Sequence, residues 1–221
     1  MDTHRLRGLY LVTPDWDDTD SLLAVTGTAL AAGAALVQYR HKSAGPALRR
    51  EQAGALLALC RRYGRPLLVN DHLDLCRELD ADGVHVGGSD LPVAQARALL
   101  GPDKIVGASC YGELKLAEAA QQAGASYVAF GGFYPSPVKK YSFVTPPELI
   151  DVWLDRVSLP MVVIGGMTPD NAAPLVARGA TMVAAITSVY AAQDPDAAVR
   201  AFCALFGHAG STMAESPTQT R

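Results

Sequence analysis

Residues 38–42 carry two cations and an amide at a spacing that suits anion binding. The segment reads Gln38-Tyr39-Arg40-His41-Lys42. If the chain is extended here, side-chain alternation places Gln38, Arg40 and Lys42 on one face. Arg and Lys side chains that converge with an amide predict a site for a phosphate or diphosphate. The alternative is an ordinary solvated loop that follows a strand.

Two carboxylates lie in the segments that follow the next two apolar runs. Asp71 comes directly after Asn70, and Asp90 ends the sequence Gly87-Gly88-Ser89-Asp90. Carboxylate oxygens are the ligands that Mg²⁺ prefers, and the metal and the cations together would neutralise a diphosphate. Each Asp also precedes an expected helix, where it could be an N-cap. The sequence leaves the metal ligand and the helix cap open as alternatives.

A second group of residues predicts a phosphate site without a metal. Gly165-Gly166 and the segment Ile186-Thr187-Ser188 each follow an apolar run. Bare backbone amides after the last strands of a barrel commonly bind phosphate, and glycine lets the backbone approach the anion closely. Ser109 ends another apolar run as a candidate polar contact. A loop over 131–141 has the composition of a lid that closes over a ligand, although an ordinary exposed loop would look the same.

Nucleophilic catalysis has little support in the sequence. There is no GxSxG motif, and His85, inside the run Gly83–Val86, is expected to be a hydrogen-bonded histidine of the barrel interior rather than a general base. Cysteines occur without a close pair or CxxC, which indicates reduced thiols rather than disulfides or a zinc site. They are Cys60, Cys76, Cys110 and Cys203.

The elements that must position these residues form a repeating pattern. Short apolar runs of the kind found in buried parallel strands alternate with Ala- and Leu-rich segments of helical periodicity. Glycines at 33, 64, 124 and 179 mark expected helix ends, and Thr168-Pro169 marks a helix start. The eight expected strands are 9–12, 35–39, 66–69, 83–86, 105–108, 127–130, 161–164 and 182–186.

Eight strand–helix units in this length predict an α/β fold, a single (β/α)8 TIM barrel over residues 1–208. An open doubly wound sheet is the alternative, but no GxGxxG follows the first strand. Residues 209–221 are small and polar without periodicity, which predicts a disordered tail. In a barrel the active site lies at the carboxyl ends of the strands, where the polar residues above collect.

Composition restricts the class of partner. The 221 residues are 49% hydrophobic and 19% charged, with a formal net charge of −3. This balance predicts no general affinity for nucleic acid or anionic membranes. Neither a membrane span nor a signal peptide is evident, so we expect a cytoplasmic enzyme or binder of small molecules. A homo-oligomer is compatible with the sequence.

The ordered set of motifs resembles the thiamine phosphate synthase (thiamine-phosphate diphosphorylase) family. The resemblance runs from about Gly8 to Thr187. It rests on the segments 38–42, Leu68-Val69-Asn70-Asp71, 81–87 with Asp90, Gly107-Ala108-Ser109, Tyr134-Pro135-Ser136-Pro137-Val138-Lys139 and Val163-Ile164-Gly165-Gly166.

The resemblance implies a Mg²⁺-dependent transferase of thiamine biosynthesis. A hydroxymethylpyrimidine diphosphate would lose diphosphate through a pyrimidinylmethyl cation, and a thiazole phosphate would take its place. Arg40, Lys42 and Lys139 would act on the leaving group, and Asp71 and Asp90 would bind Mg²⁺. The pyrimidine diphosphate would contact Gln38, Tyr39, Arg40, His41, Lys42, Asn70, Ser109 and Lys139, and the thiazole phosphate Ser136, Pro137, Val138, Gly166, Ile186 and Thr187.

Some positions depart from the family pattern. Val138 stands where a threonine is usual, and loss of one hydrogen bond there would cost about fivefold in affinity. His72 replaces a frequent second Asp, and Gly88 and Gly132 are also unusual. A related thiazole tautomerase, a non-catalytic precursor binder and a phosphosugar isomerase are the competing functions. The charged diphosphate site argues against the first two, and the absence of an evident acid–base pair against the third.

Overall fold

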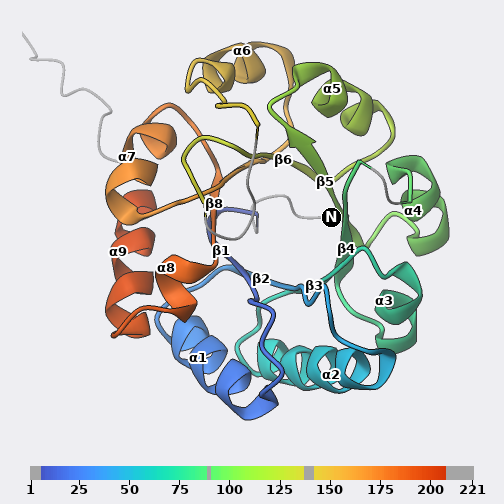
Figure 1. Cartoon of the computed structure of the whole chain (residues 1–221). Helices are drawn as coiled ribbons and strands as arrows, with labels where there is room; N and C mark the ends of the chain where they lie inside the picture. Colours follow the sequence, from blue (N-terminus) through green and yellow to red (C-terminus); the bar gives the residue numbers. More distant parts are fainter. Residues whose placement is uncertain (1–5, 89–90, 137–141, 208–221) are drawn as a thin grey trace, which may run out of the picture.

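The computed structural model describes residues 6–88, 91–136 and 142–207. Its strands form a closed parallel barrel in chain order, surrounded by helices (Figure 1), which confirms the predicted TIM barrel. The strands are β1 Gly8–Val12, β2 Leu36–Tyr39, β3 Leu67–Asn70, β4 Gly83–Val86, β5 Ile105–Tyr111, β6 Tyr127–Phe130, β7 Met161–Ile164 and β8 Met182–Ala185. The predicted tail, residues 209–221, lies outside the described residues.

The helices follow the strands as the repeat predicts. They are α1 Thr19–Ala31, α2 Pro46–Arg62, α3 Leu73–Leu79, α4 Val93–Leu100, α5 Leu114–Gln122, α6 Leu149–Arg156, α7 Pro169–Ala177, α8 Thr187–Tyr190 and α9 Pro195–Gly207. Within the described part of the chain, no helix is both long and apolar enough to span a bilayer.

Apolar side chains fill the molecule on both faces of the strands. Tyr10, Leu36 and Tyr127 point into the barrel, whereas Leu11, Val37 and Phe130 pack against the helices. Burial on both faces explains why the strands are continuous apolar runs rather than alternating ones.

Local signals set the helix limits. Thr168 caps α7 with its side chain, Asn171 completes the capping box, and Pro169 is the first helical residue, as predicted. Gly33 has a φ of 115° and Gly179 a φ of 117°, a conformation that favours glycine. These turns bring the chain back to the next strand.

One strand is longer than its apolar run predicts. β5 continues past Ala108 to Tyr111, and its register against β6 shifts between Ser109 and Tyr111. Tyr111 has a φ of 53° and reaches the barrel mouth. An irregularity of this kind can redirect a side chain beside an active site.

Candidate active site

A cavity of about 360 Å³ opens at the carboxyl ends of the strands. It lies where a TIM barrel carries its active site. The structure brings most of the predicted site residues together around it. They are Gln38, Arg40, Lys42, Asn70, Asp71, Ser109, Ser136, Gly166, Ile186 and Thr187.

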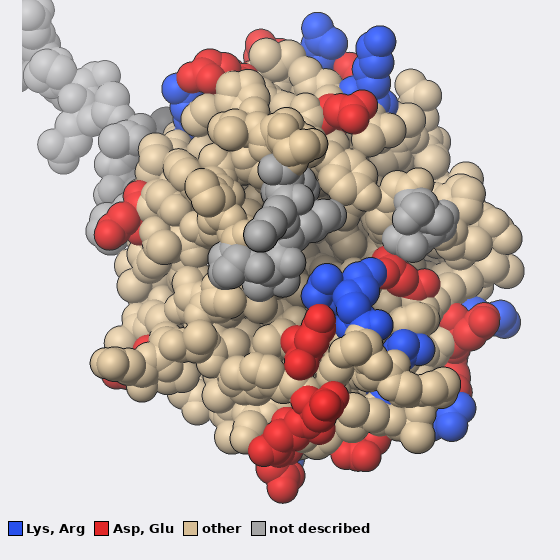
Figure 2. Space-filling model, viewed as in Figure 1, with Lys and Arg blue, Asp and Glu red and all other residues tan. Residues whose placement is uncertain are grey.

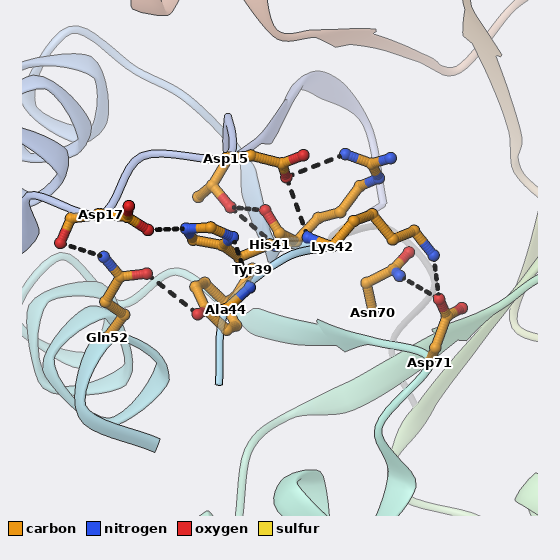
Figure 3. Close-up of polar contacts among 11 residues, drawn as sticks. Asp15, Asp17, Tyr39, His41, Lys42, Ala44, Gln52, Asn70 and Asp71 are labelled. Atoms are coloured by element: carbon orange, nitrogen blue, oxygen red, sulfur yellow. Dashed lines mark hydrogen bonds and ion pairs between the residues drawn. The ribbon is translucent and has the colours of Figure 1, made fainter. Parts of the chain in front are cut away.

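The cationic edge of the cavity is held by the loop after β1. The Thr13 hydroxyl accepts a hydrogen bond from the Arg40 backbone N–H at 2.7 Å and donates to the Arg40 carbonyl at 2.9 Å. Asp15 Oδ1 accepts from Arg40 Nη1 at 3.3 Å and from the Lys42 backbone N–H at 3.1 Å (Figure 3). These bonds fix the backbone that presents both cations.

Asp71 lies opposite these cations at the end of β3. Its Oδ2 accepts hydrogen bonds from Lys42 Nζ and from Asn70 Nδ2, each at 2.5 Å (Figure 3). The N-cap of α3 is His72. Asp71 is therefore not the N-cap of α3, and the helix-cap interpretation of this residue is excluded.

Figure 2 shows how the charges lie on this face of the molecule. Lys and Arg side chains gather near its middle, with Asp and Glu side chains beside them. The ion pairs Arg40–Asp15 and Lys42–Asp71 lie in the segments that follow β1, β2 and β3. The cations are therefore balanced by nearby carboxylates rather than isolated.

Two members of the 38–42 segment lie away from the cavity. The Tyr39 hydroxyl donates to Gln52 Oε1 at 3.0 Å. His41 Nδ1 accepts from the Ala44 N–H at 3.1 Å, and His41 Nε2 contacts Asp17 Oδ1, also at 3.1 Å (Figure 3). Strand alternation accounts for this, because residues 39 and 41 face opposite to residues 38, 40 and 42. The structure does not bring Tyr39 and His41 into the cavity lining.

Polar side chains also form the cavity floor. Gln38 contacts Tyr10, whose hydroxyl lies 2.7 Å from the Tyr127 hydroxyl. His85 Nδ1 is 2.8 Å from the Tyr127 hydroxyl, and His85 Nε2 is 2.8 Å from Ser109 Oγ. His85 is thus a hydrogen-bonded histidine of the barrel interior, as predicted. Burial raises the pKa of both tyrosines, so they remain neutral phenols.

The loop after β7 and the start of α8 form another edge of the cavity. Gly165, Gly166, Thr187 and Ser188 line it. The first amides of α8 have no carbonyl partner within their own helix. Gly166 has a φ of 60°, and a Cβ there would lie 2.1 Å from the Pro135 carbonyl oxygen. Glycine therefore allows the loop that carries Ser136 to approach β7.

Some predicted residues cannot be placed. Asp90, Pro137, Val138 and Lys139 lie outside the described residues. Among the residues that are described, no three His, Cys, Asp or Glu side chains cluster as a metal site would.

Sequence reasoning missed several residues of this site. Thr13 and Asp15 follow β1, and their position after a strand was a usable signal, because polar residues there face the mouth. Tyr10 and Tyr127 had no such signal, since an aromatic residue in a strand is normally part of the core. Tyr111 follows the predicted strand 105–108 and carried the same signal as Thr13.

Comparison with known proteins identifies similar chains. A family model described as thiamine monophosphate synthase matches residues 9–189. A thiamine-phosphate synthase of Janthinobacterium sp. (strain Marseille) is 63% identical over 201 residues, which is 91% of this chain and 97% of the relative. A thiamine-phosphate synthase of Nitrosomonas eutropha is 45% identical over 206 residues, or 93% of this chain and 97% of the relative.

A solved structure agrees with these relatives. The thiamine phosphate pyrophosphorylase from Pyrococcus furiosus superposes with a TM-score of 0.81 at 30% identity. The match covers 93% of this chain and 97% of the other. The barrel and its chain order are therefore shared along almost the whole length.

Proposed function

The chain belongs to the thiamine monophosphate synthase family, a transferase family of thiamine biosynthesis, and we propose that its barrel mouth joins a pyrimidine diphosphate to a thiazole phosphate. The observation that carries this proposal is that two groups of residues suited to anions line one cavity. Arg40 and Lys42 line one edge, and residues 165–166 and 187–188 line the other. We assign anion binding at the second edge to the backbone amides and call it the amide edge. Two phosphorylated substrates can therefore meet with their reacting ends between the edges.

The reaction transfers the pyrimidinylmethyl group. The bond between the methylene carbon and the diphosphate oxygen breaks, and diphosphate leaves with the electron pair. The thiazole nitrogen then forms a bond to the same carbon with its lone pair, which gives thiamine phosphate. Arg40 and Lys42 stabilise the charge that develops on the diphosphate, so no covalent enzyme intermediate is needed.

The floor and the amide edge orient the two substrates. Gln38, Asn70 and Ser109 hold the pyrimidine diphosphate, together with Lys139 at its leaving group. Ser136, Gly166, Ile186 and Thr187 hold the thiazole phosphate, together with Pro137 and Val138. Tyr39 and His41 contribute indirectly, because their contacts with Gln52, Asp17 and Ala44 fix the strand end that presents Arg40.

Asp71 and Asp90 would hold Mg²⁺ beside the diphosphate. The Asp71 carboxylate fits this role, because it lines the cavity next to Lys42 and offers oxygen ligands. Bound Mg²⁺ would neutralise part of the charge on the leaving diphosphate. Lys42, which pairs with Asp71 in this structure, would then be available to contact the diphosphate.

The direct test is synthesis of thiamine phosphate from both precursors, measured by fluorescence after oxidation, with Mg²⁺ and with EDTA. Product that depends on Mg²⁺ supports the proposal. A folded protein that binds thiazole phosphate but makes no product under either condition would refute it. Isomerisation of the thiazole alone would instead indicate a tautomerase.

Lys139→Ala separates chemistry from binding. We expect turnover to fall far more than affinity for thiazole phosphate, because this lysine acts on the departing diphosphate. Lys115→Ala, on α5 and away from the cavity lining, is the control. Equal losses of turnover and thiazole phosphate affinity in Lys139→Ala would contradict the assigned role.

A further inference from the structure

Five polar side chains from five strands form one hydrogen-bonded row across the barrel interior. Gln38 Nε2 donates to the Tyr10 hydroxyl at 2.5 Å, and the Tyr10 and Tyr127 hydroxyls are 2.7 Å apart. The Tyr127 hydroxyl is 2.8 Å from His85 Nδ1, and His85 Nε2 is 2.8 Å from Ser109 Oγ. We call these five side chains the buried row.

The hydrogen bonds of the buried row run in one direction. Because the Tyr10 oxygen accepts from Gln38, the Tyr10 proton points to Tyr127. Tyr127 in turn donates to His85 Nδ1, so the imidazole proton resides on Nε2 and is donated to Ser109. With Gln38 donating through Nε2, the reverse direction would leave the Tyr10 proton without an acceptor, and Tyr10 is only 1% exposed.

This direction determines what the two ends of the row offer to a ligand. Gln38 and Ser109 both line the cavity. Gln38 turns its nitrogen to Tyr10, and within the described residues its Oε1 receives no hydrogen bond. Ser109 accepts from His85, so its own proton is free to be donated. The cavity floor therefore presents one acceptor, at Gln38, and one donor, at Ser109.

We propose that the buried row is a positioning device that fixes this acceptor–donor pattern and thereby selects an aminopyrimidine over its oxo counterpart. An aminopyrimidine has an amino N–H that donates and ring nitrogens that accept, which matches the floor. The oxo counterpart has a carbonyl that accepts and a ring N–H that donates, which reverses the pattern at that edge of the ring. The inference rests on the proposed function, because it takes the pyrimidine diphosphate as the ligand.

The local sequence makes room for the row. A Cβ at Gly107 would lie 2.1 Å from Cζ and 2.2 Å from the hydroxyl oxygen of Tyr127. The Tyr127 ring meets the Tyr10 ring edge-on, with centroids 5.9 Å apart, and stacks on His85 at 5.6 Å. Glycine at position 107 and the two ring contacts therefore hold Tyr127 in the one orientation that links both ends.

The test removes one hydroxyl at a time and keeps the rings. Tyr10→Phe and Tyr127→Phe break the row, and Tyr190→Phe is the matched control. Tyr190 is also buried, and its hydroxyl contacts Thr26 at 2.9 Å, outside the row. Calorimetry measures affinity of each protein for the 4-amino and the 4-oxo pyrimidine diphosphate, and steady-state kinetics measures KM and kcat for both substrates.

We expect the ratio of the two affinities to fall about tenfold or more in both row variants, because Gln38 or Ser109 can then reverse its hydrogen bond. The KM for thiazole phosphate should change less than about twofold, since the amide edge is untouched. Tyr190→Phe should keep the wild-type ratio. Row variants that keep the wild-type ratio would overturn the proposal, as would a drop of the same size in Tyr190→Phe.

The outcomes for function and for selectivity can be told apart. A wild type that forms no thiamine phosphate and binds neither pyrimidine diphosphate refutes the proposed function and the inference with it. A wild type that discriminates, with row variants that discriminate equally well, refutes the inference alone.

A measurement on the wild type does not depend on how the variants fold. Long-range ¹⁵N–¹H spectra of protein labelled at its five histidines report which ring nitrogen carries the proton, and His85→Gln assigns the signal. We expect His85 to be protonated on Nε2 alone at neutral pH. A proton on Nδ1 would overturn the direction of the row.

Discussion

Replacing Thr13 by valine should break the two hydrogen bonds by which Thr13 holds the Arg40 backbone at the cationic edge of the cavity. We call this pair of bonds the strap. The Thr13 side chain is fully buried, and its hydroxyl bonds both the N–H and the carbonyl of Arg40. Valine keeps the shape but leaves those two backbone groups without a partner. A buried polar group that loses its partner costs about 1–3 kcal/mol.

Two backbone groups lose their partner, and we expect each loss to cost an amount near the low end of that range. Thr13→Val should therefore lower the free energy of unfolding by about 2–3 kcal/mol. For a domain of this size, the corresponding fall in Tm is about 4–12 °C. Arg40 would also lose the two bonds that fix its backbone, whereas Asp15 still holds the Lys42 N–H, and we expect kcat/KM for the pyrimidine diphosphate to fall about tenfold. The KM for thiazole phosphate should stay close to the wild-type value.

Thermal unfolding and steady-state kinetics check both effects, with Thr26→Val as the matched control. Thr26 is equally buried and bonds the Leu22 carbonyl and the Tyr190 hydroxyl, outside the cavity. The control should lose stability but keep its kcat/KM. If Thr13→Val loses stability and keeps wild-type kcat/KM, the strap does not position the cations and the reasoning is wrong.

Three further predictions concern the metal and the buried acids. Asp71→Asn should raise the Mg²⁺ concentration needed for half-maximal activity. Asp80→Asn, which breaks a similar pair with Lys104, is the control and should leave that concentration unchanged. An unchanged Mg²⁺ requirement in Asp71→Asn would refute Asp71 as a ligand. Burial raises the pKa of the Cys60 and Cys110 thiols to about 12, so mass spectrometry should find both unmodified after iodoacetamide treatment of the folded protein at pH 8. Burial also raises the pKa of Tyr39 from 10.0 to about 12. The contribution of the neutral Tyr39 phenol to the free energy of unfolding is therefore fully present below pH 10 and is lost as the pH rises through 12. Urea unfolding at several pH values would show this loss.

The strands were predictable because each lies between the barrel interior and the helices. β6 and β7 begin and end at the predicted residues, since both faces of each are buried and the apolar run ends where burial ends. β5 was predicted too short. Its extension through Ser109 to Tyr111 depends on pairing with β6 across a register shift, and the sequence of one strand does not contain that information.

The rim of the site was predictable and its floor was not. Arg40, Lys42 and Asp71 interrupt apolar runs at the ends where parallel strands converge, so their residue type and position together indicate a site. Tyr10 lies inside one apolar run and Tyr127 begins another, and a tyrosine in such a run looks like any core aromatic. Their hydroxyls acquire a role only because the barrel brings together residues 117 positions apart.

The end of β3 shows where the rim and the floor of the site meet. Asp71 has a φ of 61°, a left-handed conformation that costs a residue with a side chain about 1–2 kcal/mol. Its backbone N–H donates to the His85 carbonyl at 2.9 Å, which helps to hold that conformation and turns the carboxylate toward Lys42. The side chain of the same His85 connects Tyr127 to Ser109. One residue of β4 therefore bonds to Asp71 through its backbone carbonyl and to Tyr127 and Ser109 through its ring. A substitution at His85 keeps the carbonyl and removes only the ring contacts, so it should disturb the floor of the cavity and leave Asp71 in place.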